Sequence, residues 1–290
     1  MAKFLWTQRS DFGPEGRADH AMAFDSQRGR TVLFGGIGGN AGLGDTWEWD
    51  GSFWTQMDNT GPGPRSGHAM VYDSSRQVSI IFGGRSGTSD PPELGDTWQW
   101  DGQDWTQLAT SGPSPRAFHG MTFDSGRNRT VLFGGLATDD PPSADTWEFD
   151  GQEWTQQADT GPPPNTRSRA MAFDSTGARV LLFEGRGVTT WSWNGASWVQ
   201  IAELGPPARD FMAMTAAAGS IVLFGGGGFN GLLGDSWSFD GTHWTQVQDI
   251  GPVPRLSHAV TFDSTRSAVV LFGGLDATDA NLGDTWEHKT

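Results

Sequence analysis

Short runs in which apolar and polar residues alternate recur along the whole chain, and four kinds of run follow one another in a fixed order. In the second copy they occupy residues 68–72, 78–82, 97–100 and 105–107. Each run is rich in β-branched or aromatic residues, as half-buried strands are. An Asp-Gly pair, which suits a tight hairpin turn, separates the last two runs. The pattern predicts an all-β chain assembled from four-stranded units.

Tryptophan marks the start of the third run in every unit. Asp followed by Thr or Ser precedes this Trp in five units, and Thr190-Trp191 is a degenerate sixth copy. A second Trp stands seven residues further on in the first five units. Repeats of this length with four strands are the blades of β-propellers, so the pattern predicts a six-bladed propeller. The first tryptophans are Trp47, Trp98, Trp147, Trp191, Trp237 and Trp286.

The two ends of the chain complete one another. The sixth unit stops at Thr290 without a fourth run, while residues 5–8 (LWTQ) match residues 53–56 (FWTQ). We expect the N-terminal run to form the fourth strand of the last blade, which closes the ring and leaves no blade edge at the seam. Residues 1–290 then form a single domain, with blades at about 17–56, 65–107, 116–156, 166–200, 209–246, and 255–290 together with 3–8.

These residues resemble the kelch-repeat family, whose pattern has an Arg shortly before strand one, a Gly-Gly pair after strand two and a Trp of strand four. The resemblance covers essentially the whole chain, and it extends distantly to bacterial sialic-acid mutarotases and to the propeller of galactose oxidase. Kelch-like propellers include partner-binding adaptors and enzymes, so the fold alone implies neither role. The glycine pairs begin at Gly35, Gly83, Gly134, Gly225 and Gly273.

The composition narrows the classes of function. With no Cys and one Tyr, the chain cannot form disulfides, zinc–thiolate sites or the Tyr–Cys crosslink of the copper oxidases that it resembles. No apolar run approaches the ~20 residues that cross a bilayer, and the start lacks a signal peptide's apolar region, so we expect a cytoplasmic monomer. The net charge of -15 argues against nucleic acid. Many acidic residues recur at turns, so we interpret the charge mainly as a by-product of turns.

The loops of a propeller divide between two faces, and here they differ. Those joining strands one and two, or three and four, are short and repetitive, whereas those between strands two and three and between blades are longer and varied. Variable loops on a rigid scaffold are where binding usually resides. We therefore expect the function on this loop-rich face, around the central channel.

An arginine stands just ahead of strand one in five units, where we expect it to border the channel mouth: Arg17, Arg65, Arg116, Arg209 and Arg255. Thr166 takes this place in blade four, beside Arg167. Guanidinium groups suit carboxylates and phosphates, and kelch adaptors, by resemblance, use arginines near this position for acidic peptides. Structural bridging between blades is the competing interpretation, and it is favoured for the histidines three residues further on, His20, His68, His119 and His258.

Departures from the repeat cluster in blades four and five. Glu184 replaces the first glycine of a pair, and Arg169 and Met212 replace the histidine. The turn at residues 216–219 loses its Asp. We interpret these changes as one asymmetric pocket wall, with drift in a degenerate blade as the alternative. The predicted ligand-binding residues are Arg17, Arg65, Arg116, Phe118, Arg167, Arg169, Arg186, Arg209, Asp210, Phe211 and Arg255.

No metal site and no cofactor are expected. The six histidines lack ligand-like spacing, and the loop with Asp276 and Asp279 lacks the spacing of a calcium loop, so a solvated loop is favoured over a weak Ca²⁺ site. Nucleophile-elbow, phosphate-loop and dinucleotide motifs are missing from the sequence.

Two functions remain open. The favoured one is a binding propeller whose arginine-bordered mouth captures an acidic peptide or protein, or a small anionic ligand. The alternative is a cofactor-independent enzyme, an isomerase or mutarotase, lyase or cyclase, with Glu184 as its acid or base. A scaffold role that uses the acidic surface is a third possibility.

Overall fold

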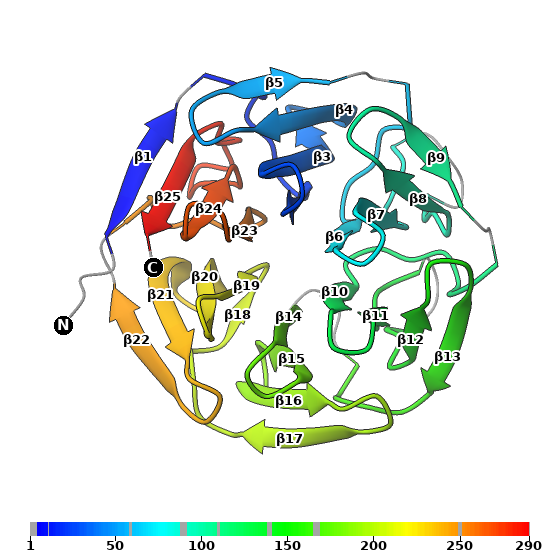
Figure 1. The fold of residues 1–290 in the computed structure, drawn as a ribbon. Helices are drawn as coiled ribbons and strands as arrows, with labels where there is room; N and C mark the ends of the chain where they lie inside the picture. Colours follow the sequence, from blue (N-terminus) through cyan, green and yellow to red (C-terminus); the bar gives the residue numbers. More distant parts are fainter. Residues whose placement is uncertain are drawn as a thin grey trace.

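A computed structural model describes residues 5–10, 12–57, 60–87, 92–108, 111–137, 141–164, 169–248 and 251–289. The strands form six antiparallel sheets set as blades around a central axis (Figure 1). Strand one of each blade lies nearest the axis and strand four lies at the rim. The predicted all-β, six-bladed propeller is confirmed.

The first three blades follow the chain from the inside of the ring to the rim. Blade one contains β2 (Ala21–Asp25), β3 (Arg30–Gly38), β4 (Ala41–Trp49) and β5 (Trp54–Gln56). Blade two contains β6 (Ala69–Asp73), β7 (Val78–Phe82), β8 (Thr97–Trp100) and β9 (Trp105–Gln107). Blade three contains β10 (Gly120–Asp124), β11 (Arg129–Phe133), β12 (Thr146–Phe149) and β13 (Trp154–Ala158).

The last three blades repeat this order with two additions. Blade four contains β14 (Arg169–Asp174), β15 (Arg179–Glu184), β16 (Thr189–Trp193) and β17 (Trp198–Ala202). Blade five has a short extra strand, β18 (Arg209–Asp210), before β19 (Ala213–Ala217), β20 (Ser220–Gly228), β21 (Gly231–Phe239) and β22 (Trp244–Gln248). Blade six contains β23 (Ala259–Asp263), β24 (Ala268–Phe272), β25 (Thr285–Lys289) and the N-terminal strand β1 (Trp6–Ser10).

The N-terminal strand closes the ring as predicted. β1 pairs with β25, with Trp6 opposite His288 and Gln8 opposite Trp286. The Trp6 indole is buried and donates a hydrogen bond to Ser236 of the preceding blade at 3.0 Å. The same bond joins every other pair of neighbouring blades, so the seam is built like the rest of the ring. These pairs are Trp54–Thr285, Trp105–Thr46, Trp154–Thr97, Trp198–Thr146 and Trp244–Thr190.

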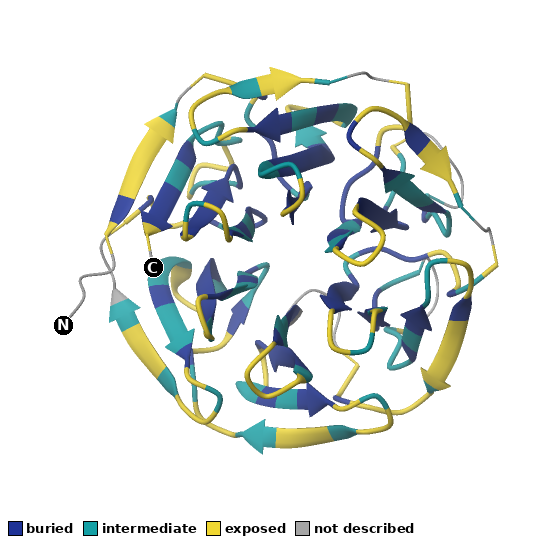
Figure 2. Cartoon of the chain, in the orientation of Figure 1, coloured by how far each residue is buried: buried dark blue, intermediate teal, exposed yellow. Residues whose placement is uncertain are grey.

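The core lies within and between the blades. Strands one and two are mostly buried and the rim strands mostly exposed (Figure 2). Large side chains pack across each interface, as where the rings of Phe34 and Trp105 lie 5.0 Å apart. A second tryptophan of strand three also joins neighbouring blades, because buried Trp100 donates to Glu48 of blade one at 3.0 Å.

Acidic residues at the turns act as predicted. The Asp50 carboxylate accepts hydrogen bonds from the backbone amides of Ser52 and Phe53, at 2.7 and 2.8 Å. These amides hold the pKa of Asp50 below its ordinary value. Equivalent carboxylates at Asp101, Asp150 and Asp240 accept the same pair of bonds. Much of the negative charge is therefore part of the repeat.

Strand ends differ from the prediction in blades one and five. We expected strand two to end at the glycine pair, but β3 and β20 continue past it into longer hairpins, with Ile37 opposite Gly42 and Gly227 opposite Leu232. The glycines adopt positive φ, at 67° and 103° for Gly35 and Gly36, which lets the strand bend there and continue. The hairpins project from the loop-rich face.

Candidate functional site: the loop-side mouth of the central channel

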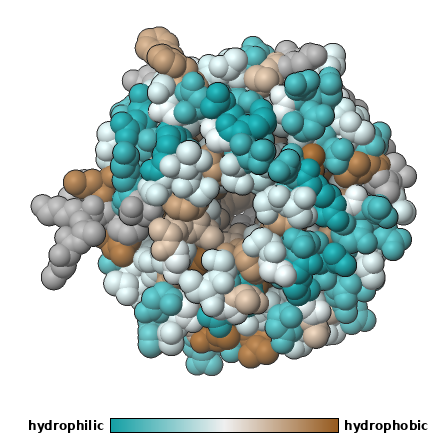
Figure 3. All heavy atoms as spheres, viewed as in Figure 1, coloured by the Kyte–Doolittle hydropathy of each residue, from teal (hydrophilic) through white to brown (hydrophobic). Residues whose placement is uncertain are grey.

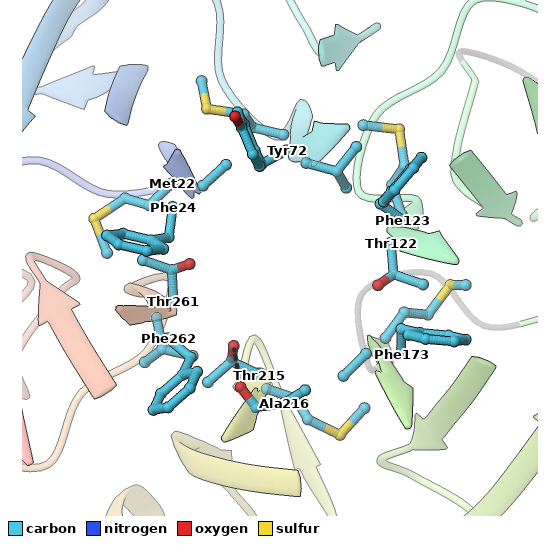
Figure 4. Close-up of a pocket in the computed structure, with 18 of the residues that line it drawn as sticks. Met22, Phe24, Tyr72, Thr122, Phe123, Phe173, Thr215, Ala216, Thr261 and Phe262 are labelled. Atoms are coloured by element: carbon cyan, nitrogen blue, oxygen red, sulfur yellow. Dashed lines mark hydrogen bonds between the residues drawn. The ribbon is translucent and has the colours of Figure 1, made fainter. Parts of the chain in front are cut away.

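Strand one of each blade runs from one opening of the central channel to the other. The loop-side mouth, where these strands begin, surrounds a recess of about 130 Å³. The turn-side opening, where they end, is a wider hollow of about 390 Å³ lined mainly by Met, Ala, Thr and aromatic side chains (Figure 4). The hollow at the centre of the ring is visible in the space-filling view (Figure 3).

The five repeated arginines are buried in ion pairs rather than exposed at the mouth. Arg65, 2% exposed, binds Asp96 through both ends of its guanidinium, at 2.7 and 2.9 Å, and donates to the Gly83 carbonyl at 3.0 Å. Burial alone raises the pKa of Asp96, but hydrogen bonds from Arg65 and its charge outweigh burial and lower it. The other pairs are Arg17–Asp45, Arg116–Asp145, Arg209–Asp235 and Arg255–Asp284.

This geometry corrects the expectation that these arginines border the mouth as accessible cations. Each guanidinium already has a carboxylate and a backbone carbonyl as partners, so capturing an external anion would require breaking a buried pair. Blade four supports this scaffold role. In its sequence Thr166, which lies outside the described residues, stands in place of the arginine. Thr189 stands in place of the aspartate and accepts the Trp191 indole bond instead. The ligand-binding role of Arg17, Arg65, Arg116, Arg209 and Arg255 stays a prediction that no contact favours.

The repeated histidines sit one layer deeper, between blades. His68 packs edge-on against Phe34 of the preceding blade, with ring centroids 5.5 Å apart. Burial, followed by the charge of Arg65, lowers the pKa of His68 to about 3. Burial and Arg255 do the same for His258. These imidazoles are therefore neutral near pH 7, and their favoured interpretation as repeat structure fits this placement.

A belt of backbone hydrogen bonds runs along the mouth through blades five, six, one, two and three. The amides of Asp19, Gly67 and Phe118 donate to the carbonyls of Ser257, Asp19 and Gly67, at 3.0, 2.8 and 2.7 Å. The Ser257 amide donates to the Phe211 carbonyl at 3.0 Å. All five residues have positive φ, between 54° and 63°. This left-handed conformation suits Asp and Gly but is costly for a bulky side chain.

Two phenylalanines nevertheless occupy this strained position. Phe118 has φ 56° and Phe211 has φ 54°. Their rings meet edge to face with centroids 6.1 Å apart, although they come from blades three and five. Both side chains are half-buried, and both line the recess. The structure thus brings together these two predicted site residues at the channel mouth.

The departures in blade four form a tight turn instead of a pocket wall. Buried Glu184 accepts hydrogen bonds from the backbone amides of Arg186, at 3.0 Å, and Gly187. Arg186 pairs at 2.9 Å with Asp210, which lies in blade five. Glu184 is not among the residues that line either opening, so its acid/base role stays a prediction without geometric support.

The two remaining predicted arginines can be placed only in part. Arg169 begins β14, where its backbone pairs with Glu184. Arg167 lies outside the described residues.

In the part of the loop-rich face that the structure describes, carboxylates outnumber arginines. Arg85 pairs with Glu93 at 2.9 Å, so every arginine side chain described on this face is in an ion pair. Carboxylates outside these pairs remain at the surface: Glu15, Asp159, Glu203, Asp276 and Asp279. The charge therefore favours a cationic partner over the acidic one predicted from the arginines.

Sequence reasoning missed one apolar group of this face. Phe229, at the tip of the blade-five hairpin, is 100% exposed. The base of that hairpin pairs with β18, with Asp210 opposite Gly227, so the tip stands beside the strand that leads to Phe211. An aromatic residue in a Gly-rich loop, where the other long hairpin has none, was the available signal.

Neither a metal site nor a membrane-spanning helix is found in the described part of the chain. Among those residues, no group of His, Asp and Glu could hold a metal ion. Asp276 accepts bonds from the amides of Thr278 and Ala280 within its own loop, which fits the favoured solvated turn. A helix long and apolar enough to cross a membrane is not found in these ranges.

Comparisons with known proteins agree with the repeat. A family model described as "KLHDC2/KLHL20/DRC7 Kelch-repeats domain" matches residues 2–187. A solved structure titled "Structure of YjhT" is similar with a TM-score of 0.73 at 16% sequence identity, covering 94% of this chain and 95% of that chain. At this identity the likeness shows the fold alone. No curated protein matches the chain.

Proposed function

Because the chain belongs to the kelch-repeat family, we propose that it is a binding propeller whose loop-side mouth holds a peptide segment of a partner protein. The observation that carries this proposal is the pair Phe118 and Phe211. Both are half-exposed aromatic residues in a backbone conformation that costs a non-glycine residue roughly 1–2 kcal/mol. Strain of this kind persists where the surrounding structure enforces it, and it clusters at binding sites.

The surroundings of this pair fit a protein partner. Aromatic residues dominate binding energy at interfaces, and they act best at the centre of a patch. Phe118 and Phe211 occupy the centre of this face, with the fully exposed Phe229 on the adjacent hairpin. Leu204 and Val253, in the loops on either side of blade five, are also exposed, at 85% and 51%. An apolar side chain of the partner would insert against the two mouth phenylalanines.

The charge of the face determines which kind of peptide we propose as the ligand. With its described arginines held in ion pairs and carboxylates left at the rim, the face attracts lysine and arginine and repels acidic segments. The proposed ligand is therefore a cationic peptide with an apolar anchor. Glu184 takes no part, because backbone amides bind its carboxylate.

The test uses two displayed peptide pools with the same Phe, Leu and Trp content, one rich in Lys and Arg and the other in Asp and Glu. Enriched peptides are then measured by fluorescence anisotropy against wild type, Phe118→Gly/Phe211→Gly and Phe229→Ser. Phe53→Ser is the matched control, because Phe53 is 74% exposed but lies in a turn on the opposite face.

We expect enrichment of cationic peptides only. Their affinity should fall tenfold or more in the mouth and hairpin variants and stay unchanged in Phe53→Ser. It should also weaken at high salt, since the rim charges are exposed. Enrichment of acidic peptides, failure to enrich any cationic peptide, or binding that survives loss of both mouth phenylalanines would each contradict the proposal.

A further inference from the structure

The turn-side opening has a collar of aromatic side chains with one position missing. In five blades strand one ends in an aromatic residue followed by Asp, and these rings surround the hollow: Phe24, Tyr72, Phe123, Phe173 and Phe262 (Figure 4). Blade five has Ala216 at this position. Figure 4 shows Ala216 in the ring where the other blades carry an aromatic side chain.

The missing ring leaves a side pocket between blades four and five. The pocket has a volume of about 280 Å³ and is lined by Phe173, Asp174 and Ser175 of blade four, residues 216–221 of blade five, and Phe262. Phe173, Ser175, Ala216 and Phe262 also line the central hollow, so the pocket opens into it. A ligand can therefore reach the pocket from the turn-side face, away from the loop-side mouth.

The gap at Ala216 is not explained by the seam of the ring, where β1 completes blade six. The neighbouring change at Ala217 is explained by it. In the other blades an arginine of the first turn lies under the glycine of the next blade's hairpin, as Arg28 does under Gly102. Blade six has no such hairpin, because its fourth strand is the N-terminal β1. Blade five therefore has no hairpin glycine in the next blade for a turn arginine to contact. This explains why Ala217 stands in place of the turn Asp. Ala216 makes no such contact, so its small size requires another reason.

The lining of the pocket selects its ligand. Phe173 and Phe262 provide aromatic walls, and Ser175 and Ser220 provide hydroxyls. Among the lining residues the one charged group is the Asp174 carboxylate, which pairs through one oxygen with Arg179 at 3.1 Å. Hydrogen bonds from Thr176, Gly177 and Arg179 overcome the effect of burial and lower the pKa of Asp174, so the carboxylate is ionised at neutral pH. Planar aromatic groups suit such walls, and a carboxylate repels anions.

We propose that this pocket, which we call the collar pocket, is a second binding site and that it takes a small aromatic amine. The aromatic ring replaces the side chain that Ala216 lacks, between Phe173 and Phe262. The ammonium group faces the Asp174 end of the pocket, where its charge is also attracted by the faces of the aromatic walls. The site is independent of the loop-side mouth and of the partner proposed there.

Methyl NMR on the wild-type protein tests the collar pocket directly. Benzylammonium is the probe, benzoate tests the sign of the charge, and cyclohexylmethylammonium tests the need for an aromatic ring. We expect benzylammonium to shift the methyl signal of Ile221, which lines the pocket, in a saturable way. The methyl signal of Ile80, in the core of blade two, should not move. Benzoate should cause no shift, and the saturated amine should bind at least several-fold more weakly.

A filling substitution gives the second arm of the test. Ala216→Phe restores the residue of the other blades, so it should weaken benzylammonium binding tenfold or more without lowering the melting temperature. Gln77→Asn, at an exposed turn residue of blade two that does not line the pocket, is the control and should bind as wild type does. Unchanged binding to Ala216→Phe, or an Ile221 signal that benzylammonium leaves unmoved, overturns the proposal. If Ala216→Phe does not fold, the wild-type shifts of Ile221 against Ile80 decide alone.

Discussion

Replacing Arg116 and Asp145 by threonine, singly and together, separates a scaffold role of the repeated arginines from a ligand-binding role. Threonine is the residue that blade four carries at both places, Thr166 and Thr189. Arg116 binds Asp145 at 2.6 and 2.9 Å and also donates to the carbonyls of Gly134 and Ser114. The pair is largely buried, with side chains 2% and 17% exposed.

The structure sets the size of each effect. Removing one member of a buried ion pair leaves the other charge without compensation and costs about 3–5 kcal/mol of unfolding free energy. The double substitution removes both charges and leaves mainly the two carbonyls short of a donor, at about 1–3 kcal/mol for each group that water cannot reach. After Asp145→Thr, the new hydroxyl would still accept the Trp147 indole bond, as Thr189 does for Trp191. We therefore expect the double variant to be more stable than the sum of the two single losses by at least about 2 kcal/mol.

Urea unfolding followed by tryptophan fluorescence measures the four proteins of this cycle. Trp147 and Trp154 of the same blade report on the transition, and the slope of each curve shows whether the unfolded surface is comparable. Arg186→Thr serves as a control, because the Arg186 side chain is 64% exposed and its ion pair with Asp210 should contribute less than about 1 kcal/mol. If Arg116→Thr is as stable as wild type, the arginine is not a scaffold residue and the reasoning fails.

Two further predictions concern pH and the closure of the ring. The buried imidazoles of His68 and His258 have a pKa of about 3 in the folded protein, against an ordinary value of 6.5. The unfolded chain therefore binds more protons between these two pH values. The stability that is present above pH 6.5 is lost as the pH falls toward 3. Between pH 7 and pH 5 each should cost about 2 kcal/mol. His68→Gln/His258→Gln should remove these two contributions in urea titrations at the two pH values, while buried His20, whose pKa is also lowered, keeps its own. Equal wild-type stability at pH 7 and pH 5 would count against the neutral histidine layer. Trp6→Ala should lower stability by about 3–5 kcal/mol, as Trp54→Ala should at the equivalent place in blade one, because both indoles bond the preceding blade. A loss below about 1 kcal/mol for Trp6→Ala alone would mean that the N-terminal strand is not part of the folded ring.

The ring itself could be predicted from the sequence because its cause is repetition. Each blade needs the same strand lengths, turn residues and indole partners, so the pattern appears six times and its one deficit is matched by one surplus at the N-terminus. Trp6 could be assigned to the last blade for this reason, and its bond to Ser236 is the one that five other tryptophans make.

The role of the arginines could not be predicted from their own repeat position. A guanidinium ahead of strand one can face the mouth or turn back into the blade, and the choice depends on a carboxylate at the start of strand three. A signal was present, since blade four lacks both members of the pair, at Thr166 and Thr189. Because blade four lacks both residues, the sequence indicates that the arginine and the aspartate act as partners.

The structure was needed to tell what each departure from the repeat does. Glu184 looked like a catalytic carboxylate, but its position in a short turn lets it accept two backbone amides. The loss of the turn Asp at Ala217 is explained by the lack of a hairpin between the third and fourth strands of blade six. Phe118 and Phe211 lie far apart in sequence and meet only because the ring places blades three and five around one small opening.

The most direct test of the account compares two double variants in a single binding measurement with the enriched cationic peptide. We predict that Arg116→Thr/Asp145→Thr binds the peptide as wild type does, because that pair belongs to the scaffold, whereas Phe118→Gly/Phe211→Gly loses at least tenfold in affinity. The glycine variant should keep its stability within about 1 kcal/mol, since relief of the left-handed strain offsets the lost ring contact. The opposite order, with binding lost on removal of the ion pair and kept without the phenylalanines, would contradict the assignment of the loop-side mouth.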